Sequence, residues 1–148
     1  MIRAQRMIAA ALVVATATLS IGCAKAPTEP LEVSDARIRT VIPGQDVTAA
    51  YVTLTNRTNA RLVINAVESA HARAIEIHAV DRVGDSVRMR RLTELAVEPG
   101  ATVRLEPGGI HLMVFGVSDP EAPFVAALVA ADGTRVEVAF ARIPPGGD

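Results

Sequence analysis

Short runs of apolar residues that alternate with polar ones fill most of this 148-residue chain beyond residue 32. In the segment 74–80, for example, Ile75, Ile77 and Ala79 alternate with Glu76 and His78. Alternation with a period of two is typical of a β-strand with one buried face. The same reasoning, with turn clusters between segments, predicts strands at 33–41, 50–55, 61–67, 74–80, 87–92, 95–97, 101–105, 110–115, 124–131 and 134–141.

No segment of this region repeats apolar residues at helical spacing. Strands that recur every 8 to 12 residues or so, with turn signals between them, indicate a two-sheet sandwich or a barrel. The pair Asp132-Gly133 is a strong hairpin signal between the last two strands. We expect antiparallel pairing throughout, because the connections are too short for crossovers. The sequence therefore predicts a single all-β domain over residues 33–143.

The N-terminus has the features of an export signal at residues 1–22. Arg3 and Arg6 precede an apolar run from Met7 to Ile21, which is short for a membrane span. Cys23 follows Gly22 and resembles the lipidated cysteine of bacterial lipoproteins, although Ser20 stands where leucine is usual. We expect lipidation of Cys23, a tether over 23–32 and a flexible tail over 144–148. The alternative is cleavage by the general signal peptidase, which would give a soluble periplasmic protein.

Composition excludes several functions. The formal net charge is -1, and it falls to -3 when the signal removes its two arginines, so the mature chain lacks the basic surface that a nucleic-acid partner needs. Cys23 is the only cysteine, so no intramolecular disulfide can form. No phosphate-binding glycine loop or nucleophile–base pairing is evident, and we do not expect an enzyme.

The methionines and histidines are the candidate chemistry. After the signal only Met89 and Met113 remain as methionines. His111 and Met113 share one face of their strand, about 7 Å apart. His78 lies on the face opposite the apolar side of its strand, and three arginines flank Met89, which is typical of a sheet edge or loop. Two imidazoles and two thioethers form a soft, neutral donor set that favours Cu(I) over hard cations.

The residues alone also allow plainer interpretations. A methionine in a β domain is usually core filler, and a lone histidine is usually a surface residue. For His71 we expect a turn residue without a ligand role. Glu76 shares a face with His78, but plain solvent exposure explains that position as well, and we expect exposure.

The spacing of the four donors resembles that of the PCuAC-type periplasmic copper chaperones. Their site is a histidine, ten residues, a methionine, twenty-one residues, and then His-x-Met. His78, Met89 and His111-Leu112-Met113 match this pattern without an insertion. The resemblance covers residues 33–142 and includes the stretches Ala49–Asn56 and Glu106–Met113. Many members have a second methionine after the first histidine, where this chain has Ala79, and the C-terminal His- and Met-rich extension of some members is absent from this sequence.

The resemblance implies a cupredoxin-like Greek-key β-sandwich that binds one Cu(I) through His78, Met89, His111 and Met113. It implies a monomeric copper chaperone of the periplasm or cell envelope. Its expected clients are cytochrome c oxidase subunit II, with its binuclear copper centre, and Sco-type copper proteins. The alternatives are a copper-sequestering protein without an oxidase client and a metal-free adhesion or interaction lipoprotein. A blue-copper electron carrier would need a cysteine ligand inside the domain.

Overall fold

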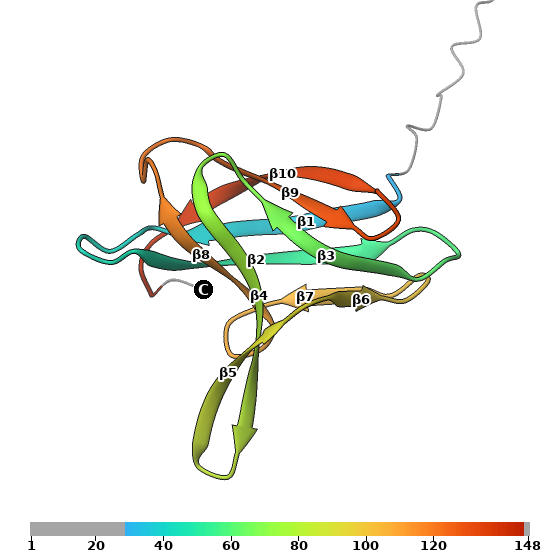
Figure 1. The fold of residues 1–148 in the computed structure, drawn as a ribbon, viewed down its shortest axis with the longest axis horizontal. Coiled ribbons are helices and arrows are strands. Elements are labelled where there is room, and N and C mark those ends of the chain that lie inside the picture. The colour runs from blue at the N-terminus through green and yellow to red at the C-terminus, as the bar shows by residue number, and fades with distance from the viewer. Residues whose placement is uncertain (1–28, 147–148) are drawn as a thin grey trace, which may run out of the picture.

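A computed structural model describes residues 29–146 of the chain. The predicted signal (1–22), Cys23 and the last two residues of the predicted tail lie outside the described residues. The described part is all-β, as predicted, and contains no helix that could cross a membrane (Figure 1). Its strands are β1 (Leu31–Arg39), β2 (Val47–Asn56), β3 (Leu62–Glu68), β4 (Ala72–Val83), β5 (Ser86–Leu92), β6 (Leu95–Val97), β7 (Thr102–Leu105), β8 (His111–Val117), β9 (Phe124–Ala130) and β10 (Arg135–Ile143).

Each of the ten predicted strands is present, with ends that differ from the prediction by up to three residues. β1 begins at Leu31, so residues 31 and 32 belong to the fold and not to the predicted tether. Leu31 is buried in the core, and Glu32 pairs with Thr55 of β2. β4 continues through residues 81–83, which the sequence analysis assigned to a turn.

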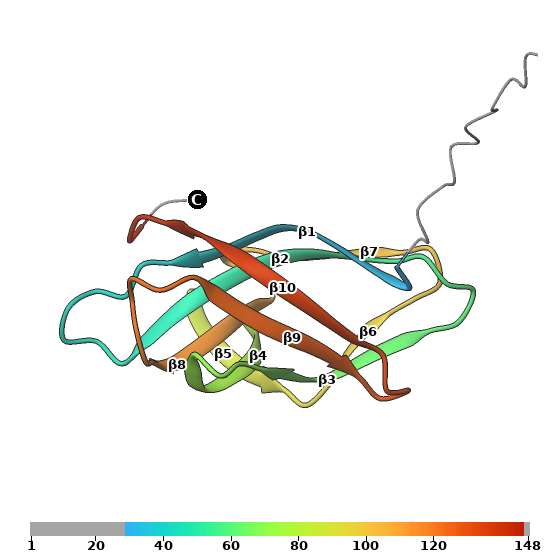
Figure 2. The same ribbon diagram turned by 90° about the horizontal axis from the view of Figure 1, so that it is seen from above.

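The strands form two layers that are joined along one edge. One layer has the order β5-β4-β8-β2-β1, with β7 also paired to β2, and the other has the order β10-β9-β3-β6. β1 and β10 join the layers and run parallel, which corrects the prediction of antiparallel pairing throughout. Short connections exclude parallel pairing only for strands close in sequence, and these two are the first and the last. Figure 2 shows β9 and β10 crossing obliquely over the other layer, as packed twisted sheets do.

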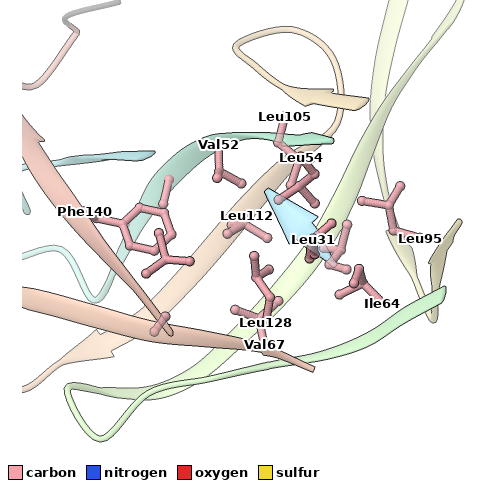
Figure 3. Close-up of a cluster of buried hydrophobic side chains, with 14 of the residues drawn as sticks. Leu31, Val52, Leu54, Ile64, Val67, Leu95, Leu105, Leu112, Leu128 and Phe140 are labelled. Atoms are coloured by element: carbon pink, nitrogen blue, oxygen red, sulfur yellow. The ribbon is translucent and has the colours of Figure 1, made fainter. Parts of the chain in front are cut away.

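The core fills the space between the two layers. Val52, Leu54 and Leu112 of the first layer point toward Val67 and Leu128 of the second (Figure 3). All five are buried. Full burial of one such side chain contributes roughly 1.5–3 kcal/mol, so these inward-facing positions fix the register of the strands that carry them.

The distal half of β4 extends beyond the sandwich together with β5 (Figure 1). β8 pairs with β4 only as far as His78, so from Ala79 onward β5 is the only strand paired with β4. The one further backbone hydrogen bond of this part of β4 within residues 29–146 is donated by the Val80 N–H to the carbonyl oxygen of Gly109. Gly84 begins the tight connection with a φ of 59°, a conformation that glycine adopts without strain. We call this two-stranded segment, residues 79–90, the ribbon.

Candidate metal centre

The registers of β4, β5 and β8 place the four candidate donors on one face of the first layer. His78 lies directly opposite His111, and Val80, two residues further along β4, lies opposite Met89. Met113 is two residues from His111 on β8. Because residues two apart on a strand share a face, all four side chains lie on the side of the sheet away from Leu112 and the core.

His111 is held in place and has one defined tautomer. Its side chain is buried, with the residue only 6% exposed. Its Nδ1 lies 3.2 Å from the carbonyl oxygen of Gly109. A carbonyl can only accept, so Nδ1 carries the proton and donates. In the neutral ring the lone pair is then on Nε2, and this nitrogen is available to a metal ion. A ligating histidine is usually fixed by such a bond from its other nitrogen.

His78 has a carboxylate in the corresponding role. Its Nε2 lies 2.9 Å from Oε2 of Glu76, and Oε1 of Glu76 lies 3.1 Å from Nη1 of Arg91. The bond to His78 lowers the pKa of the Glu76 carboxyl below its ordinary value, and the charge of Arg91 lowers it further, against the opposing effect of desolvation. The other nitrogen of His78, Nδ1, is buried and has no hydrogen-bond partner among the described residues.

The role of Glu76 corrects the sequence analysis, which expected a solvent-exposed side chain. Glu76 is only partly exposed and bridges His78 to Arg91. The same-face spacing of residues 76 and 78 was the available signal, but solvated side chains show that spacing too. The pairing of Arg91 with the neighbouring strand, opposite His78, is what gathers the three side chains together.

The two imidazole rings face each other across β4 and β8. Their centroids are 6.3 Å apart and their planes are inclined at 44°. Met113 lies next to this pair, opposite Glu76 on one side and Ala49 of β2 on the other. The small side chain of Ala49 leaves space above the sheet at this point. His78, His111 and Met113 therefore lie close together on two neighbouring strands, β4 and β8.

Met89 differs from the other three because it lies on the ribbon. β5 is the terminal strand of its layer, and Met89 is 61% exposed, which confirms the prediction of a sheet-edge methionine. Cross-strand diagonal neighbours such as His78 and Met89 lie about 7–8 Å apart. In a flat sheet Met89 and Met113 would be about 17 Å apart, so both could contact one ion only if the sheet curves.

A groove of about 390 Å³ lies on this face of the sheet. Met89, His111 and Met113 all line it, whereas His78 is not among its lining residues. The charged side chains along it are those of Arg39 and Arg82, and no carboxylate of the described residues lines it. The remaining lining residues are Val47, Thr48, Ala49, Tyr51, Val80, Val87, Pro107 and Gly108.

His71 lies apart from this group, as expected. It precedes β4, and its ring is 6.4 Å from that of Phe124, at the end of β4 that is remote from His78. A larger cavity of about 450 Å³ near His71 is lined by Glu68, Ser69 and Arg135 but contains no methionine or cysteine. Within residues 29–146 no cluster of three or more His, Cys, Asp or Glu side chains could hold a metal ion.

Comparison with known proteins identifies the class to which this protein belongs. The sequence matches the LpqE-like family, described as lipoproteins, over residues 31–143. The chain belongs to this family, which is part of the PCuAC group. No curated protein gives a significant match to the sequence.

Solved PCuAC domains share the fold. The copper-bound PCuAC domain from PmoF2 superposes with a TM-score of 0.66 at 18% identity, covering 78% of this chain and 94% of that domain. The solution structure of apo-DR1885 from Deinococcus radiodurans gives a TM-score of 0.59 at 23% identity, covering 95% and 97%. The CuI-DR1885 structure gives the same score and identity and covers 82% of each chain. These likenesses confirm the predicted cupredoxin-like β fold.

Proposed function

We propose that this protein is a periplasmic copper chaperone that carries one Cu(I) on His78, Met89, His111 and Met113. The observation that carries the proposal is the state of the two histidines. One nitrogen of each is engaged by an oxygen acceptor, and the other is left for a metal ion. Two thioethers on the same face complete a neutral, soft donor set, which suits a soft monovalent ion.

Family membership supports the same conclusion. Two of the solved relatives contain copper by their own descriptions, as the copper-bound domain from PmoF2 and as CuI-DR1885. The sequence spacing of the four donors is that of the PCuAC pattern. No comparable observation supports an enzymatic role. In this proposal the copper ion is an ion that the protein transfers to a recipient and not a catalytic cofactor.

The exposure of the ligands gives an order of transfer. Met89 is the most accessible donor, so a soft ligand of the recipient replaces it first, and Met113 follows. The histidines leave last, because the Gly109 carbonyl and Glu76 hold their rings in position. Stepwise exchange keeps the ion coordinated throughout and avoids release of free Cu(I).

The recipient in this proposal is the binuclear copper centre of cytochrome c oxidase subunit II, reached directly or through a Sco-type protein. A lipid on Cys23 would keep the monomeric carrier at the membrane surface, with residues 24–30 as a tether to β1. Mass spectrometry of the native N-terminus tests the anchor. A diacylglyceryl mass on Cys23 is expected, and an unmodified N-terminus at another residue contradicts it.

Anaerobic Cu(I) titration against a chromophoric chelator tests the site. The mature chain should carry Cys23→Ser, so that its thiol does not bind copper itself. We expect one Cu(I) per chain, and a fall in affinity of at least about 100-fold in a Met89→Ala/Met113→Ala variant. His71→Ala is the matched control and should bind as the parent does. Equal binding by the methionine variant, or no binding by the parent, would contradict the proposed function.

A further inference from the structure

The outer edge of β5 is open to solvent. β5 is the terminal strand of its layer, and residues 86–91 are all exposed. Apart from its pairing with β4, β5 makes no backbone–backbone hydrogen bond within residues 29–146. An edge strand with free N–H and C=O groups can pair with a further strand, and proteins usually cover or blunt such an edge.

The hydrogen bonds of β4 show which residues of β5 face this edge. The N–H of Val80 donates to the carbonyl oxygen of Gly109, on the side of β4 away from β5. Opposite residues of an antiparallel pair direct their N–H and C=O groups either toward each other or away from each other. Because Val80 lies opposite Met89 and points away from it, Met89 directs its own backbone groups to the open edge. Val87 and Arg91, each two residues from Met89, do the same.

This direction links the open edge to the proposed metal donors. The residues of β5 whose backbone groups face the edge are the residues whose side chains share a face with Met89. In an added antiparallel strand, the residue opposite Met89 would form a hydrogen-bonded pair with it, with Cα atoms about 5.5 Å apart. Its side chain would lie on the donor face, next to the most exposed thioether.

The opposite face of β5 is basic. Arg88 and Arg90 alternate with Met89 and therefore point to that face. Arg90 is paired with Asp81 of β4, whereas Arg88 has no ion pair within residues 29–146. In an added strand, the two residues on either side of the one opposite Met89 would lie opposite these arginines. Acidic side chains at those two positions would be complementary to them.

We propose that the open edge of β5 binds an extended segment of a copper-exchanging protein by strand addition, and that this segment carries a soft ligand between two acidic residues. The inference rests on the proposed function, because it assigns a partner to the same site. Main-chain hydrogen bonds to Val87, Met89 and Arg91 hold the segment. The copper–sulfur bond to Met89 breaks as a bond to the partner's soft ligand forms. The copper stays monovalent, and where the ligand is a thiol, its proton passes to solvent.

A second copy of this chain is the other strand that the edge could bind, and the charges of β5 disfavour it. Antiparallel pairing of two β5 strands about Met89 would place Arg88 opposite Arg90 of the second copy, twice by symmetry. Like charges directly opposite each other destabilise a pair of strands. Charged side chains on an edge therefore oppose self-association, whereas an acidic segment removes the repulsion.

Peptide binding to the copper-free Cys23→Ser chain tests the docking by fluorescence anisotropy. The first peptide, Thr-Val-Glu-Met-Glu-Val-Thr, has the proposed pattern, and the second has lysines in place of both glutamates. The glutamate peptide should bind at least about 10-fold more tightly at low salt, and the ratio should shrink as salt screens the charges. Arg88→Glu should abolish this preference, whereas Arg61→Glu, at an exposed position before β3, should keep it.

Backbone methylation tests the strand addition itself. N-methylation of the peptide's methionine removes the N–H that would face β5 and should weaken binding at least about 10-fold. N-methylation of the second glutamate, whose N–H would face away from β5, is the matched control and should have a much smaller effect. In the protein, bound peptide should slow amide exchange at Val87, Met89 and Arg91, measured by NMR. The amides of Arg88 and Arg90, which already face β4, should change little.

Transfer kinetics connect the docking to copper. With cysteine in place of the methionine, the glutamate peptide should take Cu(I) from the loaded Cys23→Ser chain at least about 10-fold faster than the same peptide N-methylated at the cysteine. The peptide N-methylated at the second glutamate should react as the unmodified one does.

Several outcomes overturn the proposal. Equal affinity for the two peptides, or equal effects of the two N-methylations, would exclude strand addition at β5. A parent chain that is a dimer by sedimentation and a monomer as Val87→Pro, which removes one edge N–H, would assign the edge to a second copy. A chain that binds Cu(I) but no glutamate peptide at about 1 mM contradicts the docking alone. A chain that binds no Cu(I) in the earlier titration contradicts the proposed function itself.

Discussion

β8 and the ribbon both contribute donors to the proposed site, but they differ in packing and exposure. β8 lies between β4 and β2 in its layer, and its Leu112 is buried in the core beside His111. The ribbon has two strands and no third strand beside them, and its Val83, Val87 and Met89 side chains are exposed to solvent. A carrier needs both conditions, since rigid donors define the metal and an accessible donor permits its exchange.

This difference should appear most strongly in stability. Leu112→Ala removes a core side chain and should lower the free energy of unfolding by about 3 kcal/mol, because it leaves a cavity between the layers. Val87→Ala, on the ribbon, should change it by less than about 0.5 kcal/mol. Urea unfolding followed by circular dichroism measures both. Similar losses for the two variants would show that the ribbon is packed as tightly as β8.

Metal affinity should separate the two regions next. His111→Ala should reduce Cu(I) affinity by at least about 100-fold, because the fixed Nε2 donor is lost. Met89→Leu, which keeps the volume of the side chain, should reduce affinity by only about 10-fold. Chelator competition gives both values. An equal loss of Cu(I) affinity in Met89→Leu and His111→Ala would contradict this difference, because the ribbon would then be as essential for copper binding as β8.

The smallest expected effect concerns Glu76 and has a defined pH dependence. Its pKa is lowered in the folded state, so its carboxylate contributes stability above its ordinary pKa, and this contribution is lost as the pH falls through the lowered value. Glu76→Gln should therefore unfold at a slightly lower urea concentration than the parent at pH 7. The two proteins should become equal once the pH lies below the lowered pKa of Glu76. Equal unfolding midpoints of the two proteins at pH 7, or a gap that persists at pH values below that pKa, would contradict the proposed bond to His78.

The sequence predicted features that depend on local pattern. The alternation in 74–80 and in the strand 110–115 correctly gave the faces of Ile77 and Leu112, and the three arginines that flank Met89 indicated its edge position. The features it missed depend on pairing between distant segments. Leu31 follows a proline-bearing stretch, and only its pairing with Asn56 makes it part of β1.

The same limit applies to the surroundings of the candidate donors. The parallel contact of β1 with β10 joins the two ends of the domain, and no local signal encodes it. The bridge from His78 through Glu76 to Arg91 depends on the register of β4 with β5. The spacing of the four donors could be recognised in the sequence because it follows a family pattern. The hydrogen-bond partners of the two histidines could be identified only in the folded structure.

X-ray absorption at the copper edge of the Cu(I)-loaded Cys23→Ser chain tests the central claim most directly. The account predicts two nitrogen and two sulfur scatterers around a single Cu(I), with one sulfur lost in Met89→Leu and the nitrogen shell unchanged. A copper environment without sulfur, or one that Met89→Leu leaves unaltered, would contradict the proposal that the ribbon and β8 share one metal ion.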